Sequence, residues 1–223
     1  MNTVAYRTAE QINSAMLNVY NHMFLAVVNS MIDRALVASS PALMQFLFTG
    51  AMKWIVIFAP LLMIFVLGYG MQKMTRGQAQ LALHGFAALM GVSFATIFVI
   101  FSIGSIVGAF MAAAVLFATM SLYGYFTRRS LDSLGQWMFV GLIAIIVASV
   151  INIFVGSSVA QMVISALAIV IFLGLTAYDT QKIRELVSVD HTGNTEVVGA
   201  LTLYLDFINL FLNLLQLFGG RRD

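Results

Sequence analysis

The sequence contains no cysteine, only two prolines and very little charge. Without cysteine the chain forms no disulfide and offers no thiolate for catalysis or metal binding, which leaves the redox state of its compartment undetermined. Charged residues make up 9% of the chain, whereas a soluble domain usually carries about 25%. This shortage of charge excludes an ordinary soluble domain.

Charge is missing altogether from two long tracts, residues 77–127 and 133–178. Each tract is long enough for two membrane crossings at about 20 residues per helix. Their apolar runs are continuous rather than alternating, which excludes a membrane β-barrel. The net charge of +2 does not suggest nucleic-acid binding. We therefore predict an all-α protein that crosses a lipid bilayer several times.

Seven apolar runs predict membrane-spanning helices, near residues 20–38, 52–71, 80–101, 104–126, 134–155, 157–178 and 198–218. No proline-rich or serine-rich linker separates them, so we expect residues 20–223 to form a single seven-helix transmembrane domain. Residues 1–19 are expected to be a cytoplasmic or interfacial segment that contains a short amphipathic helix. The first span, rather than a cleaved leader, would then direct insertion.

The first apolar run differs from the others because it contains Asn29, Asp33 and Arg34. A charge near the middle of a membrane costs about 2.5–3.5 kcal/mol on insertion scales. Adjacent residues of a helix do not face each other, so Asp33 and Arg34 do not simply neutralise one another. This run either crosses with partners for its charges or lies partly at the interface.

The distribution of lysine and arginine predicts the orientation. If all seven runs cross, the side of the amino terminus holds seven basic residues: Arg7, Lys73, Arg76, Arg128, Arg129, Lys182 and Arg184. The opposite side holds three: Lys53, Arg221 and Arg222. Without the first crossing the division is six against five. The positive-inside rule therefore favours seven spans, a cytoplasmic amino terminus and a carboxyl terminus outside.

The last apolar run carries an ionisable residue, Asp206, inside a sequence that is otherwise able to cross a bilayer. Asn209, Asn213 and Gln216 follow it at offsets of three, seven and ten, which return to one face of a helix. Such a polar face avoids lipid, and an intramembrane carboxylate is a functional candidate by default. We expect the three amides to line a path that leads outward from Asp206.

Asp179 follows the predicted sixth span and provides a partner for Asp206. The predicted topology places the two carboxylates on consecutive antiparallel helices and within roughly two helical turns in depth. At a separation of about 4 Å their repulsion would be about 4 kcal/mol, so the pair would share a proton or bind a hard cation. Alternatively, Asp179 merely ends the sixth helix and is solvated by the following loop.

Other motifs are weaker. His84 is predicted to be a buried, hydrogen-bonded residue, and Gly85, Gly91, Gly104 and Gly108 are predicted to allow close helix packing. The sequence contains no P-loop, no GxSxG, no HExxH and no cluster of cysteine and histidine. We therefore expect neither an enzyme nor a resident cofactor.

Four segments together closely resemble bacterial members of the Bax inhibitor-1 family. They are GLTAYDTQKI at 174–183, ALTLYLDFINLFLNLLQLFGGRR at 200–222, MSLYGYFTRRSLDSLG at 120–135 and FAALMGVSFATIF at 86–98. The resemblance implies a seven-helix bundle with the carboxyl-terminal helix at its centre, in a bacterial inner membrane. It also implies a pH-sensitive calcium leak, with the family's aspartate pair at Asp179 and Asp206. A basic latch on that pair would be Lys73 or Arg76.

Two further functions stay open at this point. The first is a non-transporting regulator that binds membrane proteases or other integral proteins, as some bacterial relatives are described. The second is a proton/calcium exchanger, which differs from a leak because calcium movement would be coupled to a proton gradient.

Overall fold

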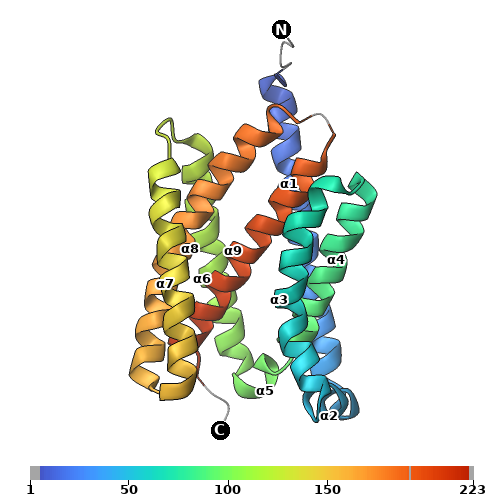
Figure 1. Ribbon diagram of the computed structural model, residues 1–223, viewed down its shortest axis with the longest axis vertical. Helices are drawn as coiled ribbons and strands as arrows, with labels where there is room; N and C mark the ends of the chain where they lie inside the picture. Colours follow the sequence, from blue (N-terminus) through green and yellow to red (C-terminus); the bar gives the residue numbers. More distant parts are fainter. Residues whose placement is uncertain (1–5, 191, 221–223) are drawn as a thin grey trace. The chain divides into compact units, whose positions relative to one another are not determined.

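A computed structural model describes residues 6–190 and 192–220, and this part of the chain is helical without a strand (Figure 1). Its helices are α1 (Ala9–Ala38), α2 (Pro41–Phe48), α3 (Met52–Gly70), the short 3-10 turn η1 (Met71–Lys73), α4 (Arg76–Ser93), α5 (Ile97–Ile100), α6 (Ile103–Phe126), α7 (Asp132–Val155), α8 (Ser158–Val187) and α9 (Asn194–Phe218).

Within the described residues, five helical stretches are long and apolar enough to cross a membrane. They are Arg76–Ile100, Ile103–Phe126, Asp132–Val155, Ser158–Val187 and Asn194–Phe218. A sixth span results if α1 and α2, which are bent by 101° relative to each other, are counted together. The remaining apolar helix, α3, is shorter than these candidate spans over its described residues and is not counted as one of them. The all-helical membrane class is therefore confirmed, but the predicted count of seven spans is not.

The amino-terminal region is one continuous helix of 30 residues, so the expected amphipathic segment and the first apolar run belong to the same helix. Thr8 caps α1 in a reciprocal capping box with Gln11. No glycine or proline interrupts the following residues, and the buried face continues through Ala15, Val19 and Met23. Helix propensity and a continuous buried face thus extend through the predicted boundary.

The contacts between residues divide the chain into two compact units. The first unit comprises residues up to Ile100 together with Leu186–Tyr204, and the second comprises Phe101–Glu185 together with α9 from Leu205 onward. Whether the chain folds as one domain stays a prediction.

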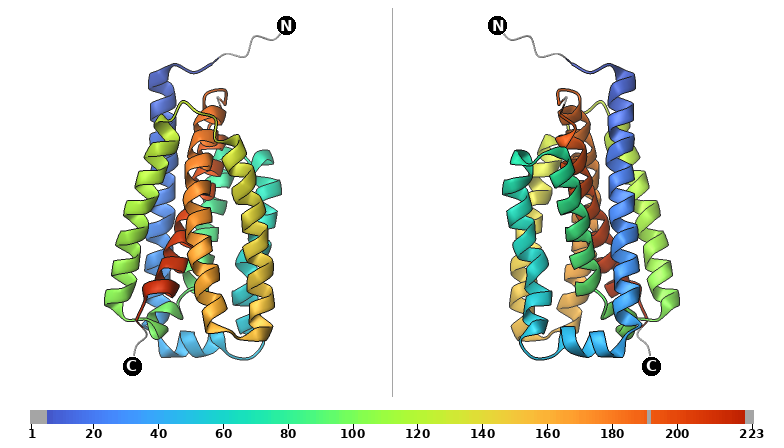
Figure 2. Two further views of the ribbon diagram at one scale, coloured as in Figure 1. Left: turned by 90° about the vertical axis from the view of Figure 1, so that its left-hand side faces the viewer. Right: turned by 90° about the vertical axis from the view of Figure 1, so that its right-hand side faces the viewer.

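In the first unit, α4 packs against both α1 and α3. Gly91 permits the contact with α1, because a methyl group at this position would lie 2.5 Å from the carbonyl oxygen of Ser30. The hydroxyl of Ser93 donates a hydrogen bond of 2.7 Å to the carbonyl of Val56 on α3. Figure 2 shows α2 turned across the ends of α1 and α3.

In the second unit, glycines bring α8 close to α6 and α7. Gly124 of α6 lies directly against the backbone of Ala177, and Gly135 of α7 lies against the ring of Tyr178. By contrast, no described residue lies within 4 Å of a methyl group placed on Gly104 or Gly108. The close packing predicted for Gly91 is thus observed, whereas the pair at 104 and 108 has no such contact in the described chain.

The helix α8 continues to Val187, although the sequence predicted its end at Tyr178. No proline or glycine follows Tyr178 until Gly193, and helix-forming residues such as Gln181 and Lys182 extend the helix. Asp179 therefore lies inside a helix, and the alternative in which it ends one is wrong.

Among the five candidate spans, α9 has the largest buried fraction. In its apolar stretch 67% of the residues are buried, against 6% in α7. A high buried fraction is expected of a helix that packs against others, and Asp206 belongs to the buried part of α9, whereas Asn209 and Asn213 are partly buried and Gln216 is exposed.

Candidate functional site

Asp206 is held within the second unit by the aromatic residue that follows it. The ring of Phe207 packs edge-to-face against Phe110 and Phe117 of α6, with centroids at 5.3 and 5.7 Å. These contacts fix the rotation of α9 about its own axis. Asp206 is only 4% exposed.

Asp179 is half-buried on a turn of α8 that is fixed from two sides. The two preceding residues lie against Gly124 and Gly135, as described above. The following residue, Thr180, shares a hydrogen bond of 2.9 Å with Ser121 of α6, and both side chains are buried. Packing therefore determines the position of this carboxyl group.

The side chains of Asp179 and Asp206 interact with each other within the second unit, so the structure places the predicted pair side by side. A hydrogen bond between two carboxyl groups requires a proton on one of them, since an ionised carboxylate only accepts. The Oδ2 atom of Asp206 is enclosed and has no hydrogen-bond partner among the described residues. A buried oxygen of this kind is costly unless a proton or cation satisfies it.

The predicted polar face of α9 is present, but much of its hydrogen-bonding capacity is used locally. Asn209 and Asn213 each donate to the carbonyl group four residues earlier, at 2.8 Å. Gln216 is exposed and accepts a hydrogen bond of 3.4 Å from Ser165 of α8. The lining of an ion path by these residues stays a prediction.

The two candidate latch residues lie near the start of α4. Lys73 ends the turn η1 and is exposed, whereas Arg76 is the first residue of α4. The guanidinium of Arg76 forms an ion pair of 2.8 Å with Glu196. A latch on the aspartate pair by either residue also stays a prediction.

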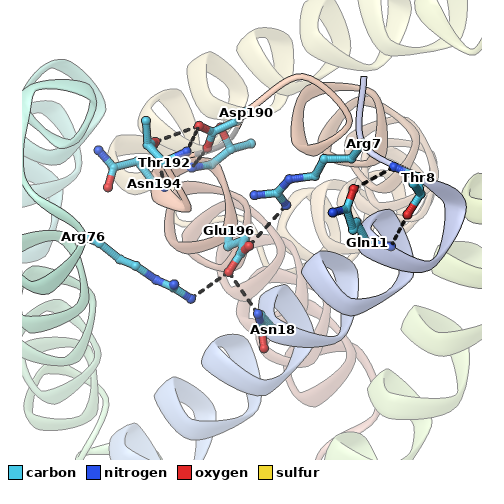
Figure 3. Close-up of polar contacts among 10 residues, drawn as sticks. Arg7, Thr8, Gln11, Asn18, Arg76, Asp190, Thr192, Asn194 and Glu196 are labelled. Carbon is cyan, nitrogen blue, oxygen red and sulfur yellow. Dashed lines mark hydrogen bonds and ion pairs between the residues drawn. The ribbon is translucent and has the colours of Figure 1, made fainter. Parts of the chain in front are cut away.

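Glu196 is a buried charge that the sequence analysis missed. It is 5% exposed, and it accepts hydrogen bonds from Arg76 at 2.8 Å, Asn18 at 3.1 Å and Arg7 at 3.4 Å (Figure 3). These partners lie 120 to 189 residues away in the sequence. The available signal was an acidic residue just before an apolar run, which is typical of the first turn of a helix.

A second carboxylate, Asp190, caps the residues at the start of α9. Its oxygens accept hydrogen bonds from the backbone N–H groups of Thr192 and Thr195, at 2.7 and 2.9 Å, and from the Thr192 hydroxyl (Figure 3). Partial burial raises the pKa of Asp190, but these hydrogen bonds outweigh it and hold the pKa well below its usual range. The side chain of Asn194 then donates to the carbonyl of Met74, at 2.8 Å.

The polar residues of α1 that made its apolar run unusual face α4. Asn29 forms a hydrogen bond of 3.1 Å with His84, and His22 forms one of 3.2 Å with Gln80. Arg34 is 2% exposed and lies 5.7 Å above the ring of Phe94. The hydrogen bond predicted for His84 is thus observed, its side chain is partly buried, and its partner Asn29 is one of the polar residues of the first apolar run.

The described residues contain no group of three or more histidine, aspartate or glutamate side chains that could hold a metal ion. These features define an integral membrane protein of several apolar helices with a buried carboxyl pair.

Comparison with known proteins assigns the family. The family described as inhibitor of apoptosis-promoting Bax1 matches residues 12–223, so the chain belongs to the Bax inhibitor-1 family. It is 38% identical to inner membrane protein YbhL of Escherichia coli, over 93% of this chain and 92% of that protein. It is also 38% identical to the uncharacterized protein RP147 of Rickettsia prowazekii, over 96% and 92% of the two chains. The resemblance predicted from the motifs is therefore confirmed.

Proposed function

We propose that the protein is a pH-sensitive calcium leak in which Asp179 and Asp206 form the ion-binding and proton-binding site. The observation that supports this function is the direct pairing of the two carboxyl groups from α8 and α9. Intramembrane carboxylates that pair with each other are typical of ion and proton pathways.

The number of ligands favours transport over permanent binding. Calcium takes about six to eight oxygen ligands, and two carboxylates supply at most about four. Water or carbonyl groups would complete the shell, so the ion would bind weakly and leave readily. Weak, partly hydrated binding suits an ion in passage.

Protons and calcium compete for the same oxygens. When one carboxyl group is protonated, the pair is joined by a hydrogen bond and one ligand oxygen is occupied. When both are ionised, their repulsion favours a divalent cation between them. Acidification therefore lowers the affinity of the site for calcium and changes the population of conducting states. The amides Asn209, Asn213 and Gln216 would line the outward path, and Lys73 or Arg76 would stabilise the closed state.

The proposed orientation has the amino terminus in the cytoplasm and the carboxyl terminus outside a bacterial inner membrane. It rests on the excess of lysine and arginine on the predicted amino-terminal side.

The proposal is tested by calcium flux into proteoliposomes across a range of pH. We expect Asp206→Asn and Asp179→Asn to abolish the pH dependence and to reduce the flux at least tenfold, since a loss of about 1.4 kcal/mol in binding corresponds to this factor. Asp132→Asn is the matched control, because Asp132 is 61% exposed at the start of α7. An unchanged flux and pH response in Asp206→Asn excludes the leak. Flux that requires a proton gradient identifies an exchanger, and absence of flux in the wild type favours the regulator.

A further inference from the structure

A polar cavity lies beside α1 in the first unit. It has a volume of about 300 Å³ and is lined by Arg7, Gln11, Ser14, Ala15, Asn18 and Glu196. Positions 11, 14 and 18 recur at helical spacing on one face of α1, and Arg7 lies just before the start of this helix. The lining contains neither residue of the aspartate pair.

Arg7 and Glu196 are the charged residues of the lining, and Arg76, which is outside the lining, pairs with Glu196 and adds a second positive charge nearby. Glu196 contributes one negative charge, while Arg7 and Arg76 contribute two positive charges (Figure 3). The closer partner of Glu196 is Arg76, at 2.8 Å, and Asn18 also donates to it at 3.1 Å. Arg7 is the more distant partner, at 3.4 Å. The guanidinium that lines the cavity is therefore the one whose charge Glu196 compensates least.

Arg7 is fixed in place before any ligand binds. Its backbone N–H donates a hydrogen bond of 2.8 Å to the carbonyl of Ser188, and its side chain is only 13% exposed. The neighbouring Thr8 caps α1. A preorganised guanidinium presents several donors in a planar fork that matches the oxygens of a phosphate group.

An apolar surface begins next to the cavity. Leu17 and Phe24 follow Ser14 by three and ten residues on α1, so they continue the helix surface away from the cavity, and they are 63% and 65% exposed. In a membrane protein such side chains face acyl chains. A phosphate group held at Arg7 would therefore have its hydrocarbon chains along this surface.

We propose that this cavity binds the phosphate headgroup of an anionic phospholipid, with Arg7 as its principal ligand and Ser14 and Gln11 as polar neighbours. Basic pockets at the ends of membrane helices are suited to such headgroups, and each arginine near the surface strengthens the attraction. The site is separate from the carboxyl pair, so its test does not depend on calcium transport.

The test measures binding of phosphatidylglycerol to the purified full-length chain in detergent, by native mass spectrometry and by the lipid-dependent shift in Tm. Phosphatidylcholine and inorganic phosphate are measured in parallel. We expect phosphatidylglycerol to bind best and Arg7→Gln to weaken it about fivefold, as for one arginine near a membrane surface. Arg128→Gln, which removes an exposed arginine between α6 and α7, is expected to leave binding unchanged.

A second variant separates binding from folding, because Arg7→Gln also removes an ion pair. Ser14→Leu fills part of the cavity while Arg7, Arg76 and Glu196 are retained, and it is expected to weaken phosphatidylglycerol binding without lowering the Tm of the lipid-free protein. Equal binding of phosphatidylglycerol and phosphatidylcholine overturns the proposal. A Tm shift with inorganic phosphate equal to that with phosphatidylglycerol also overturns it. Unchanged phosphatidylglycerol binding in both Arg7→Gln and Ser14→Leu overturns it as well.

Discussion

Two buried carboxylates on α9, Glu196 and Asp206, are ten residues apart and differ in how their charges are compensated. Glu196 is surrounded by two arginines and an amide, whereas the partner of Asp206 is another carboxyl group. A buried acid with basic partners has a structural role, since its charge is neutralised within the protein. A buried acid paired with an acid requires a proton or a cation from outside. This difference is the chemical reason to place transport at Asp206 rather than at Glu196.

We expect Glu196→Gln to destabilise the protein by about 1–3 kcal/mol, because it leaves two arginines without their shared counter-ion. Loss of the ion pair with Arg76 contributes the smaller share of this destabilisation, because the Arg76 side chain is 46% exposed and its charge is screened by solvent. Thermal unfolding in detergent measures the change in Tm. Glu10→Gln is the matched control, because Glu10 is exposed in the first turn of α1. Equal Tm values for the two variants would contradict the structural role of Glu196.

At Asp190 the structure predicts a dependence of local stability on pH. The folded pKa is lower than the unfolded value of about 3.9, so the ionised carboxylate stabilises the folded connection. This stabilisation is fully present well above the unfolded pKa of about 3.9. It is lost as the pH falls below about 3.9 towards the folded pKa.

An NMR titration of the Asp190 carboxyl carbon is expected to give a midpoint below about 3.9. The protection of the Thr192 and Thr195 amides against hydrogen exchange, relative to an unfolded chain at the same pH, should fall over the same acid range. In Asp190→Asn this protection should be low at every pH. A midpoint at or above the value of free aspartate is the result that would refute the capping contacts.

The position of the helix α8 depends on Gly124 of α6 and Gly135 of α7, which allow these helices to approach it closely. A methyl group on Gly124 would overlap the carbonyl of Ala177, two residues before Asp179. We expect Gly124→Ala to destabilise the protein by about 1–3 kcal/mol, as for overpacking in a core, and to impair the site by displacing α8. Gly108→Ala on the same helix is the control, because no described residue lies within 4 Å of its added methyl. Tm and calcium flux report the two effects; similar losses in both variants would argue against this contact.

The elements that the sequence predicts well are those whose signal is local. The apolar runs of α6 and α7 end at glycine, serine or charged residues, and the predicted bounds agree with the structure within two residues or so. The pairing of Asp179 with Asp206 followed from consecutive antiparallel helices. The extension of α8 beyond Tyr178 was missed because polar residues at a membrane surface continue a helix as readily as they end it.

Contacts between distant segments were not predictable from one sequence. Glu196 falls between the predicted spans 157–178 and 198–218, and its partners Arg7 and Arg76 belong to segments far away in the chain. The same applies to His22 and Gln80, which pair across α1 and α4. Helical periodicity indicates which face of a helix is polar, but it does not indicate which other helix that face meets.

For the whole molecule, the number of crossings decides the side on which every loop lies. The predicted seven spans place Thr8 and Ser130 in the cytoplasm and Thr49 and Ser157 outside. The structure has five or six candidate spans, and the difference from the predicted seven lies in the α1–α3 region. The chain has no cysteine, so single cysteines introduced at these positions report their side without a background signal.

We expect Thr8→Cys and Ser130→Cys to be protected from a membrane-impermeant thiol reagent in intact cells, and Thr49→Cys and Ser157→Cys to be labelled. The reason is the excess of lysine and arginine on the side that holds Thr8 and Ser130. Lysis should expose all four positions and serves as the control for reactivity. If Thr8 is labelled while Ser130 is protected, the region before α4 crosses the membrane once rather than twice, and the amino terminus lies outside. Protection at Ser157 together with labelling at Ser130 would reverse the orientation, and the proposed pH response of the carboxyl pair would then refer to the opposite compartment.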